Sequence, residues 1–422
     1  MHPNALLDLA TELLRNVLKF DAPADSVVSS FFRLHRALGA RERHALAETV
    51  YHVLRRRAML QHLAQSGTGA LERRLAILGW QGGDGLLRGA LGPREQDWRR
   101  QVGSIDPAGF SEKLRHNLPE WLAHALRTEL GDEEFWALVR AQEVPAPLDL
   151  RVNTLKARPE DAQRSLQEAG ITCEPTPYSP WGLRVPGKPA LNRVPLFEAG
   201  AIEVQDEGSQ LLALLVQARR GEMVVDFCAG AGGKTLALGA AMRSTGRLYA
   251  FDVSGHRLEA LKPRLKRSGL SNVHPVQIAH ERDDRINRLA GKIDRVLVDA
   301  PCSGLGTLRR NPDLKWRQSP QAVQELSAKQ RAILDSSVRL LKPGGRLVYA
   351  TCSLLRSENE DVADAFEAAH PELRRLDAAA VLEQAGVPDA GSLARAGCLR
   401  LWPHRHGSDG FFAVVWERQI AS

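Results

Sequence analysis

Two cysteines in this 422-residue chain directly follow apolar segments that read as strands. Cys302 lies in the run Asp299-Ala300-Pro301-Cys302-Ser303-Gly304, and Cys352 lies in Thr351-Cys352-Ser353. A cysteine thiolate is a strong nucleophile that bonds readily to an electron-poor carbon. A single thiol near a cofactor loop is common, whereas two are not. The pair therefore indicates covalent chemistry on an electron-poor ring.

A glycine-rich turn precedes both cysteines and indicates a cofactor site. It follows a predicted strand and reads Ala229-Gly230-Ala231-Gly232-Gly233-Lys234-Thr235. The GxxxxGK[ST] motif that cradles phosphates is not present, because the chain has no glycine where that motif requires its first one. We therefore expect a nucleoside-type ligand without phosphates. The glycines alone are weak evidence, because they also suit an ordinary turn.

An acidic residue closes the next predicted strand and supports the same interpretation. Asp252 occupies the position at which an acid commonly hydrogen-bonds the hydroxyls of a ribose. The alternative is that Asp252 caps a helix that begins near Ser254. The sequence leaves both roles open.

The elements that must position these residues alternate between strand and helix after about residue 200. The predicted strands are Val224–Cys228, Leu248–Asp252, Val273–Ile278, Arg295–Ala300, Arg346–Thr351 and Phe411–Trp416. Helical runs between most of them predict βαβ units and a largely parallel sheet. Open sheets of this kind bind ligands at the carboxyl ends of their strands, which is where the cysteines and the glycine-rich turn fall.

Two further regions precede this sheet. Residues 1–140 are predicted to be helical, with amphipathic stripes such as those of residues 6–18 and 40–54. The second stripe ends in Arg55-Arg56-Arg57, which is either a solvated helix end or a phosphate contact. A proline-rich linker at Val144–Pro147 marks a boundary. Residues 145–200 then read as a small α+β module, with a strand at Leu148–Asn153, a helix over 159–169 and a strand at Gly182–Val185.

Composition limits the class of protein. The chain is 43% hydrophobic and 25% charged, which is typical of a soluble globular protein. It has no apolar run of transmembrane length and no signal peptide. Its five scattered cysteines lack CxxC spacing, so we expect reduced cytoplasmic thiols and no metal site. The net charge of +7 favours a polyanionic partner, and we favour a monomer.

The three motifs together resemble those of the RNA cytosine-C5 methyltransferases that use S-adenosylmethionine. The relevant runs are 228–235, Asp299–Gly304 and Thr351–Ser353, and the similarity extends over 147–153 and 204–210. The Sun/RsmB type, which methylates small-subunit ribosomal RNA, is the most similar. The resemblance implies a Rossmann-like class I methyltransferase domain over 201–422, preceded by an all-α, NusB-like RNA-binding domain over 1–140 and the small α+β RNA-binding module.

The resemblance also assigns roles to the catalytic residues. Cys352 is implied to be the nucleophile that adds to C6 of cytosine, and Cys302 is implied to assist proton removal and release of the enzyme. Asp299 is implied to hydrogen-bond the ring around N3 and N4, and Lys234 to lie near the ring or at the helix start. The residues implied to bind S-adenosylmethionine are Asp226, Cys228, Ala229, Gly230, Gly232, Gly233, Lys234, Asp252, Arg257, Asp299 and Pro301.

The other cysteines and the loop after Gly304 carry further predictions. Cys228 is favoured as a small packing residue, and Cys173 and Cys398 are expected to be structural. We expect the loop to line the RNA cleft, with phosphate contacts from its arginines. Its aromatic residue is either a stacking platform for bases or a core residue. The residues predicted to contact RNA are Arg309, Arg310, Asn311, Lys315 and Trp316.

Two departures from the family pattern concern the cofactor. The turn has Gly230-Ala231 where the family commonly has Ala-Pro. The acid of the usual Gly-Asp-Ala motif after the third strand is missing, which leaves Glu281 and Asp283 as candidates for contact with adenine N6. We predict methylation of C5 of a cytidine, with ribosomal RNA favoured. The alternatives are transfer RNA or another RNA as substrate, and a non-catalytic RNA-binding factor for ribosome assembly.

Overall fold

The computed structural model describes residues 2–187 and 189–420, which form two compact units. The helical unit contains the chain up to Pro145 together with Thr307–Ser319. The sheet unit contains Ala146–Gly306 and the chain from Pro320 onward. The boundary at Pro145 falls inside the predicted proline-rich linker. Among the described residues, no helix combines the length and apolarity that crossing a membrane requires.

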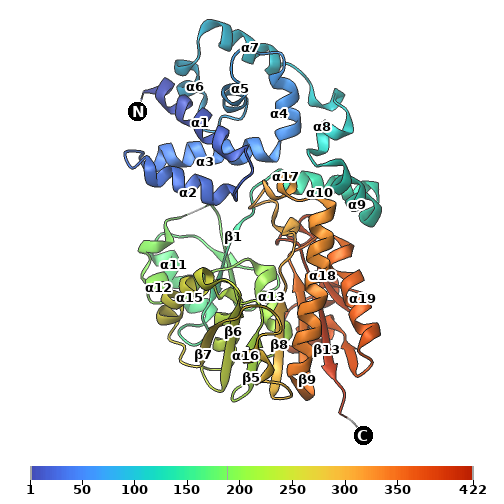
Figure 1. Ribbon diagram of the computed structural model, residues 1–422. Helices are drawn as coiled ribbons and strands as arrows, with labels where there is room; N and C mark the ends of the chain where they lie inside the picture. The colour runs from blue at the N-terminus through green and yellow to red at the C-terminus, as the bar shows by residue number, and fades with distance from the viewer. Residues whose placement is uncertain (1, 188, 421–422) are drawn as a thin grey trace. The chain divides into compact units, whose positions relative to one another are not determined.

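The helical unit is built from short amphipathic helices around one apolar core. Its core includes Leu7, Leu14 and Leu46, which are fully buried and lie on the predicted apolar stripes. Figure 1 shows the part of this unit up to Pro145 in blue to teal, and α17 (Leu314–Arg317) in orange. Its helices are α1 (Pro3–Val17), α2 (Ala24–Leu34), α3 (Ala40–Arg55), α4 (Arg57–Ala64), α5 (Leu71–Leu78), α6 (Asp84–Ala90), α7 (Pro93–Gly103), the 3-10 turn η1 (Pro107–Gly109), α8 (Glu112–His116), α9 (Glu120–Leu130), α10 (Asp132–Gln142) and α17 (Leu314–Arg317).

Residues 307–319 are an insertion from the far part of the chain that completes the core of the helical unit. The indole N–H of Trp316 donates to the carbonyl of Leu54 at 2.9 Å, and its ring packs against the helical core. The carboxylate of Asp313 accepts from the backbone N–H of Ala24 at 3.1 Å. The predicted domains, 1–140, 145–200 and 201–422, assigned this segment to the methyltransferase domain instead.

Two of the three arginines where α3 meets α4 contact this insertion. Arg55 is buried, and its guanidinium donates to the carbonyl of Arg309 at 2.9 Å. The guanidinium of Arg57 lies 5.0 Å from the ring centroid of Trp316, a cation–π distance. Arg56 pairs with Glu143 at 3.2 Å. The prediction of a solvated helix end is therefore wrong for Arg55.

The sheet unit begins with the small α+β module that the sequence predicted. Its four-stranded antiparallel sheet has the order β2-β3-β1-β4, and Arg184 on β3 pairs with the buried Asp149 on β1. The elements are β1 (Leu148–Val152), α11 (Pro159–Glu168), β2 (Glu174–Pro175), β3 (Gly182–Val185), η2 (Leu191–Arg193), α12 (Pro195–Glu198) and β4 (Ile202–Val204).

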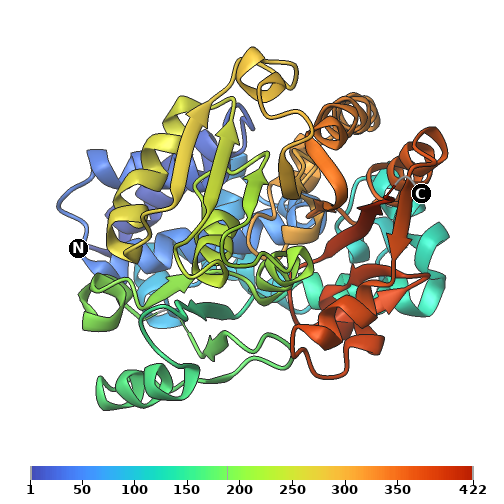
Figure 2. The ribbon, with the colours of Figure 1, turned by 90° about the horizontal axis from the view of Figure 1, so that it is seen from below.

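The second sheet of this unit is largely parallel, as predicted. Strands β7-β6-β5-β8-β9 are parallel neighbours, and β13 continues the sheet antiparallel to β9. Figure 2 shows these strands from yellow-green to red. Their bounds are β5 (Met223–Asp226), β6 (Arg247–Asp252), β7 (Val273–Gln277), β8 (Ile293–Asp299), β9 (Leu341–Thr351), β10 (Leu373–Leu376), β11 (Ala394–Arg395), β12 (Cys398–Leu401) and β13 (Phe411–Arg418). The six predicted strands are confirmed, whereas the short β10, β11 and β12 were not predicted.

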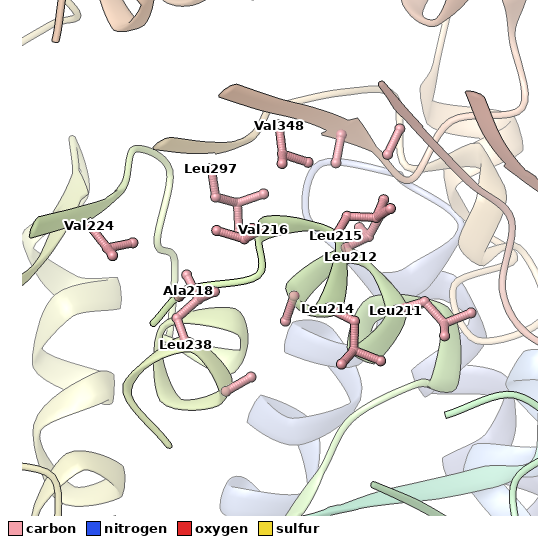
Figure 3. Close-up of a cluster of buried hydrophobic side chains, with 14 of the residues drawn as sticks. Leu211, Leu212, Leu214, Leu215, Val216, Ala218, Val224, Leu238, Leu297 and Val348 are labelled. Atoms are coloured by element: carbon pink, nitrogen blue, oxygen red, sulfur yellow. The ribbon is translucent and has the colours of Figure 1, made fainter. Parts of the chain in front are cut away.

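Helices cover both faces of this sheet because successive strand residues point to opposite sides. Val224, Leu297 and Val348 pack against the leucines of α13 on one face, as Figure 3 shows. Val225 and Val296 pack with residues of α18 and α19 on the other face. The helices are α13 (Glu207–Val216), α14 (Gly233–Ala241), α15 (Gly255–Ser268), α16 (Asp284–Asn287), α18 (Pro320–Ser337), α19 (Glu360–Ala369), α20 (Ala378–Gln384) and α21 (Pro403–His406), with the 3-10 turns η3 (Leu305–Thr307), η4 (Val338–Leu340), η5 (Arg356–Glu358) and η6 (Ala390–Leu393).

The packing of Trp316 gives a prediction for stability. Replacement of Trp316 by Ala should lower the free energy of unfolding by about 2–3 kcal/mol, because it removes a large ring from the core of the helical unit. Thermal and denaturant unfolding would measure this change. The control is Leu34→Ala, which alters an exposed side chain and should change stability by less than about 0.5 kcal/mol. An unchanged stability with weakened RNA binding would instead identify Trp316 as a stacking platform.

Candidate active site

A cavity of about 710 Å³ opens at the carboxyl ends of the parallel strands of the sheet unit. Its walls come from the ends of β5, β6, β8 and β9, from the turn before α14, and from α18. The lining residues are Asp226, Phe227, Cys228, Ala229, Gly230, Ala231, Gly233, Lys234, Asp252, Val253, Ser254, Arg257, Ile278, Glu281, Asp299, Ala300, Pro301, Cys302, Lys329, Ile333 and Cys352. With the exception of Gly232, every residue predicted to be catalytic or to bind the cofactor is among them.

The two predicted cysteines meet in this cavity. The Sγ atoms of Cys302 and Cys352 are 3.4 Å apart, and both thiols are free. They come together because β8 and β9 pair in parallel and end at the same level, with Asp299 opposite Ala350. The contact with Cys352, followed by burial, raises the pKa of Cys302 well above its ordinary value. Cys302 therefore keeps its proton, and either thiol can donate in the contact between them.

An ion pair lies in the same cavity as the thiols. The Nζ of Lys234 is 2.7 Å from Oδ2 of Asp299, and both side chains are mostly buried. Burial is the largest influence on Lys234 and lowers its pKa, but the charge and hydrogen bond of Asp299 outweigh it and raise the pKa overall. Lys234 is therefore a cation, and its charge also interacts with Cys352. A negative charge that develops at Cys352 or on a ring beside it is favoured here.

Asp226, at the end of β5, has a buried carboxyl group in which only one of the two oxygens has a hydrogen-bond partner among the described residues. Its Oδ2 accepts from the hydroxyl of Thr235 at 2.7 Å. Its Oδ1 is buried without a hydrogen-bond partner among the described residues. Burial raises the pKa of Asp226 to about 7. An orphaned acceptor at the wall of a cavity points to a ligand that donates a hydrogen bond.

Asp252 ties the end of β6 to the glycine-rich turn. Its Oδ2 accepts from the backbone N–H of Gly230 at 2.8 Å, and its Oδ1 accepts from Ser254 at 2.7 Å. Ser254 itself caps α15 by accepting from the backbone N–H of Arg257. The alternative in which Asp252 is the cap of this helix is therefore wrong. Its carboxylate faces the cavity, where it can still accept from a ribose.

Gly232, which does not line the cavity, allows two helices behind the cavity to pack closely. Gly232 has φ = +83° and is the N-cap of α14. A Cβ at this position would lie 2.1 Å from a methyl carbon of Leu261. Gly232 therefore allows α14 to start close to α15, a packing role rather than a lining role.

Glu281 and Asp283, the two candidates for contact with adenine N6, lie in different surroundings. Glu281 lines the cavity. Asp283 caps α16, because its carboxylate accepts from the backbone N–H groups of Ala279 and Arg285, both at 2.9 Å. Glu281 is therefore the remaining candidate of the two.

Some cavity residues were not predicted from the sequence. Val253 and Ile278 follow β6 and β7 directly, so the strand pattern could have indicated them. Ile333 and Lys329 lie on α18, and no local signal places this helix at the cavity. Cys228 packs against the core beneath the sheet while also lining the cavity, and burial raises its pKa well above the ordinary value.

The residues predicted to contact RNA lie in the inserted segment of the helical unit and do not line the cavity. Lys315 is buried, and its Nζ donates to the carbonyl of Arg55 at 2.8 Å. Burial lowers the pKa of Lys315 to about 7. Arg309 is buried, whereas Arg310 and Asn311 are partly exposed. For Trp316 the packing supports the core alternative, and RNA contact by this segment stays a prediction.

Comparison with known proteins places the chain in a family. Residues 213–416 match the family described as 16S rRNA methyltransferase RsmB/F, and residues 118–191 match its ferredoxin-like domain. A probable ribosomal RNA small subunit methyltransferase B from Synechocystis is 34% identical over 309 residues, which are 73% of this chain and 68% of that protein. The chain belongs to the RsmB/F methyltransferase family.

Solved structures agree with this assignment. The crystal structure of PH0851 superposes with a TM-score of 0.80 at 26% identity and covers 99% of both chains. A methyltransferase homolog from Pyrococcus horikoshii superposes with a TM-score of 0.63 at 28% identity over 74% of this chain and 100% of that chain. The predicted Rossmann-like methyltransferase fold with a preceding helical region is therefore confirmed.

The cofactor of this RsmB/F methyltransferase is S-adenosylmethionine, and the cavity suits it chemically. Asp252 offers carboxylate oxygens to ribose hydroxyls, as acids at this position commonly do. The free Oδ1 of Asp226 can accept from the ammonium of the methionine part. Val253 and Ile278 offer apolar surface to an adenine ring. The described residues contain no group of three or more candidate metal ligands.

The raised pKa of Asp226 predicts how stability depends on pH. The folded chain holds this proton up to about pH 7, whereas the unfolded chain loses it near pH 4, so the free energy of unfolding falls between these values as pH rises. Asp226→Asn stays neutral, so its stability relative to the wild type should rise by about 2–3 kcal/mol from pH 5 to pH 8.

Chemical denaturation of the cofactor-free protein at both pH values would measure this difference. The control is Asp97→Asn, because the Asp97 side chain is 65% exposed and its replacement should change stability by less than about 0.5 kcal/mol. A constant difference between Asp226→Asn and the wild type from pH 5 to pH 8 would contradict the raised pKa.

Proposed function

We propose that this protein methylates C5 of a cytidine in small-subunit ribosomal RNA through a covalent bond between Cys352 and C6 of the base. The contact between the Sγ atoms of Cys302 and Cys352 carries the proposal. An oxygen or an exocyclic nitrogen is nucleophilic enough to take a methyl group directly. An enzyme that methylates such an atom therefore needs no nucleophilic thiol and no pair of thiols. Methylation at C5 needs one thiol to activate the ring and a second group to complete the reaction.

The first part of the reaction falls to Cys352. C5 of cytosine is a poor nucleophile, so the Cys352 thiolate first adds to C6. The new S–C6 bond uses the electrons of the thiolate, and the C5=C6 π electrons move toward C5 and N3. We assign to Asp299 a hydrogen bond to the ring around N3 and N4, and the Lys234 cation lies beside it. S-adenosylmethionine supplies an electrophilic methyl carbon to C5.

The second part of the reaction falls to Cys302. Its pKa is high in the resting site chiefly because of the contact with Cys352. Once the Cys352 sulfur is bonded to carbon, it is a neutral thioether, and this influence is removed. We assign the next step to Cys302: it passes its own proton to solvent, against the burial and the Glu358 charge that still raise its pKa, and its thiolate takes the proton from C5. The S–C6 bond breaks, its electrons return to Cys352, and the C5=C6 double bond is restored.

Two further observations support an RNA substrate. The relatives are named as methyltransferases of small-subunit ribosomal RNA, and the chain carries a net charge of +7. A cytidine inside a helix must leave its stack to reach thiols at the wall of a cavity. We therefore assign the choice of nucleotide to the helical unit and the small α+β module.

The proposal predicts opposite behaviour of two cysteine variants. Cys352→Ala should abolish both turnover and the covalent RNA complex, because no thiolate can add to C6. Cys302→Ala should slow turnover and let a covalent complex with RNA accumulate, because release is blocked. Denaturing gel electrophoresis of enzyme with labelled 16S rRNA, and with transfer RNA in a parallel arm, would measure both.

The matched control is Cys173→Ala, which alters a buried cysteine in the small α+β module and should retain turnover. Loss of turnover in both active-site variants without a covalent complex in either would contradict the assigned roles. Complex formation on transfer RNA alone would keep the chemistry and overturn the ribosomal substrate.

A further inference from the structure

A buried carboxylate joins the two cysteine-bearing segments behind the cavity. Glu358, in η5, is fully buried. Its Oε2 accepts from the hydroxyls of Ser303 and Ser353, both at 2.5 Å. Its Oε1 accepts from the backbone N–H of Ser303 at 2.8 Å. These serines directly follow the two cysteines in sequence, so a single side chain bridges both segments.

Each oxygen of the Glu358 carboxylate accepts two hydrogen bonds. Nε2 of Gln330 donates to Oε1 at 3.1 Å, which gives each carboxylate oxygen two donors. An ionised carboxylate only accepts hydrogen bonds, so four N–H and O–H groups suit it without leaving a buried donor unpaired. The same Gln330 amide donates to the carbonyl of Pro301 at 3.0 Å. The network therefore also reaches the residue before Cys302.

The segment around Glu358 is fixed to the sheet on the Cys352 side. The hydroxyl of Tyr349, on β9, donates to the carbonyl of Glu358 at 2.5 Å. Nδ2 of Asn359 donates to the carbonyl of Ser353 at 3.0 Å, and Thr351 donates to the Asn359 side chain. The carboxylate is thus held by β9, and it holds the segment that follows β8.

The two cysteine-bearing segments contact each other at two neighbouring points, through their serines and through their thiols. The hydroxyl oxygens of Ser303 and Ser353 are 3.2 Å apart in the interior, and the thiols of the preceding residues are 3.4 Å apart at the cavity. Neighbouring residues point in different directions, so the serines form the buried side of the same junction. The contact between the serines and the contact between the thiols therefore join the same two segments.

We propose that Glu358 is a positioning residue that sets the separation of the two thiols, so that Cys302 reaches the ring bonded to Cys352 during release. This inference rests on the proposed function. The negative charge of Glu358 also contributes to the raised pKa of Cys302, after the contact with Cys352 and burial. Glu358 does not touch the cavity, so it acts through the backbone and the serines.

The first test measures thiol spacing without RNA. Diamide, a diazene oxidant, takes two hydrogen atoms from two neighbouring thiols, which form a disulfide while the reagent is reduced to a hydrazine. We expect it to link Cys302 to Cys352 rapidly in the wild type. Glu358→Gln should form this link about tenfold more slowly, because an amide nitrogen cannot accept from the serine hydroxyls. Mass spectrometry of the linked peptides would follow the rate.

The second test measures release. Glu358→Gln should lower kcat by about 10- to 100-fold, leave the KM for RNA unchanged and accumulate the covalent complex, as expected for Cys302→Ala. The matched control is Glu207→Gln, which makes the same change at a fully buried carboxylate whose hydrogen bonds to Tyr178 and Ser179 lie outside this network, and which should not accumulate the covalent complex. If Glu358→Gln does not fold, Ser303→Ala and Ser353→Ala each remove one donor and should show the same pattern more weakly.

The outcomes separate this inference from the proposed function. A Glu358→Gln enzyme that forms the disulfide and turns over at wild-type rates, with only its thermal stability lowered, overturns the positioning role. A slower disulfide in Glu358→Gln, together with no covalent RNA complex in any variant, supports the positioning role and overturns the proposed reaction.

Discussion

The parallel pairing of β8 with β9 is the constraint on which the site depends. It places Asp299 opposite Ala350, so the two strands deliver their next residues to one edge of the sheet. The backbone N–H of Ala300 still donates to the carbonyl of Ala350 at 2.9 Å, which extends the pairing toward the cysteines. Cys302 and Cys352 follow within three residues of the strand ends, so the pairing of the strands brings their two segments side by side.

Charge in the cavity is arranged around this edge. Three aspartates, at positions 226, 252 and 299, end three neighbouring strands, and Lys234 is the cation beside them. The effects of burial and of Asp299 oppose each other at Lys234, and Asp299 prevails. Asp226 has no such cation in contact, and burial dominates there. One cavity can therefore hold a charged pair next to the thiols and, at the cofactor wall, an acid whose pKa burial raises to about 7.

The sheet and most residues of the site could be predicted from the sequence because the signals for them are local. Each parallel strand is a short apolar run, and the residue that follows it lies at the ligand-binding edge. The short strands β10, β11 and β12 were not predicted because two to four residues are too few to show an alternation of apolar and polar side chains. Gly232 packs closely against Leu261, and the turn motif does not say which of its glycines faces the cavity; its contact with the cofactor stays a prediction.

Other features depend on contacts between residues far apart in the chain. Nothing near Trp316 reveals that it packs against helices more than 250 residues earlier, as its bond to Leu54 requires. Lys329 lies on a helix whose placement at the cavity follows from the fold alone. Glu358 reads as an ordinary acid in the run Ser357-Glu358-Asn359-Glu360, and only the folded chain places it between two serines.

The most direct test of the central claim, a covalent methylation of cytidine at C5 by Cys352, is bisulfite sequencing of total RNA. The strains compared would lack the gene, or carry the wild type or Cys352→Ala in its place. We predict that one cytidine of small-subunit ribosomal RNA loses its protection in the deletion strain, and that only the wild type restores it. An unchanged map of 5-methylcytosine, or restoration by Cys352→Ala, would contradict the account.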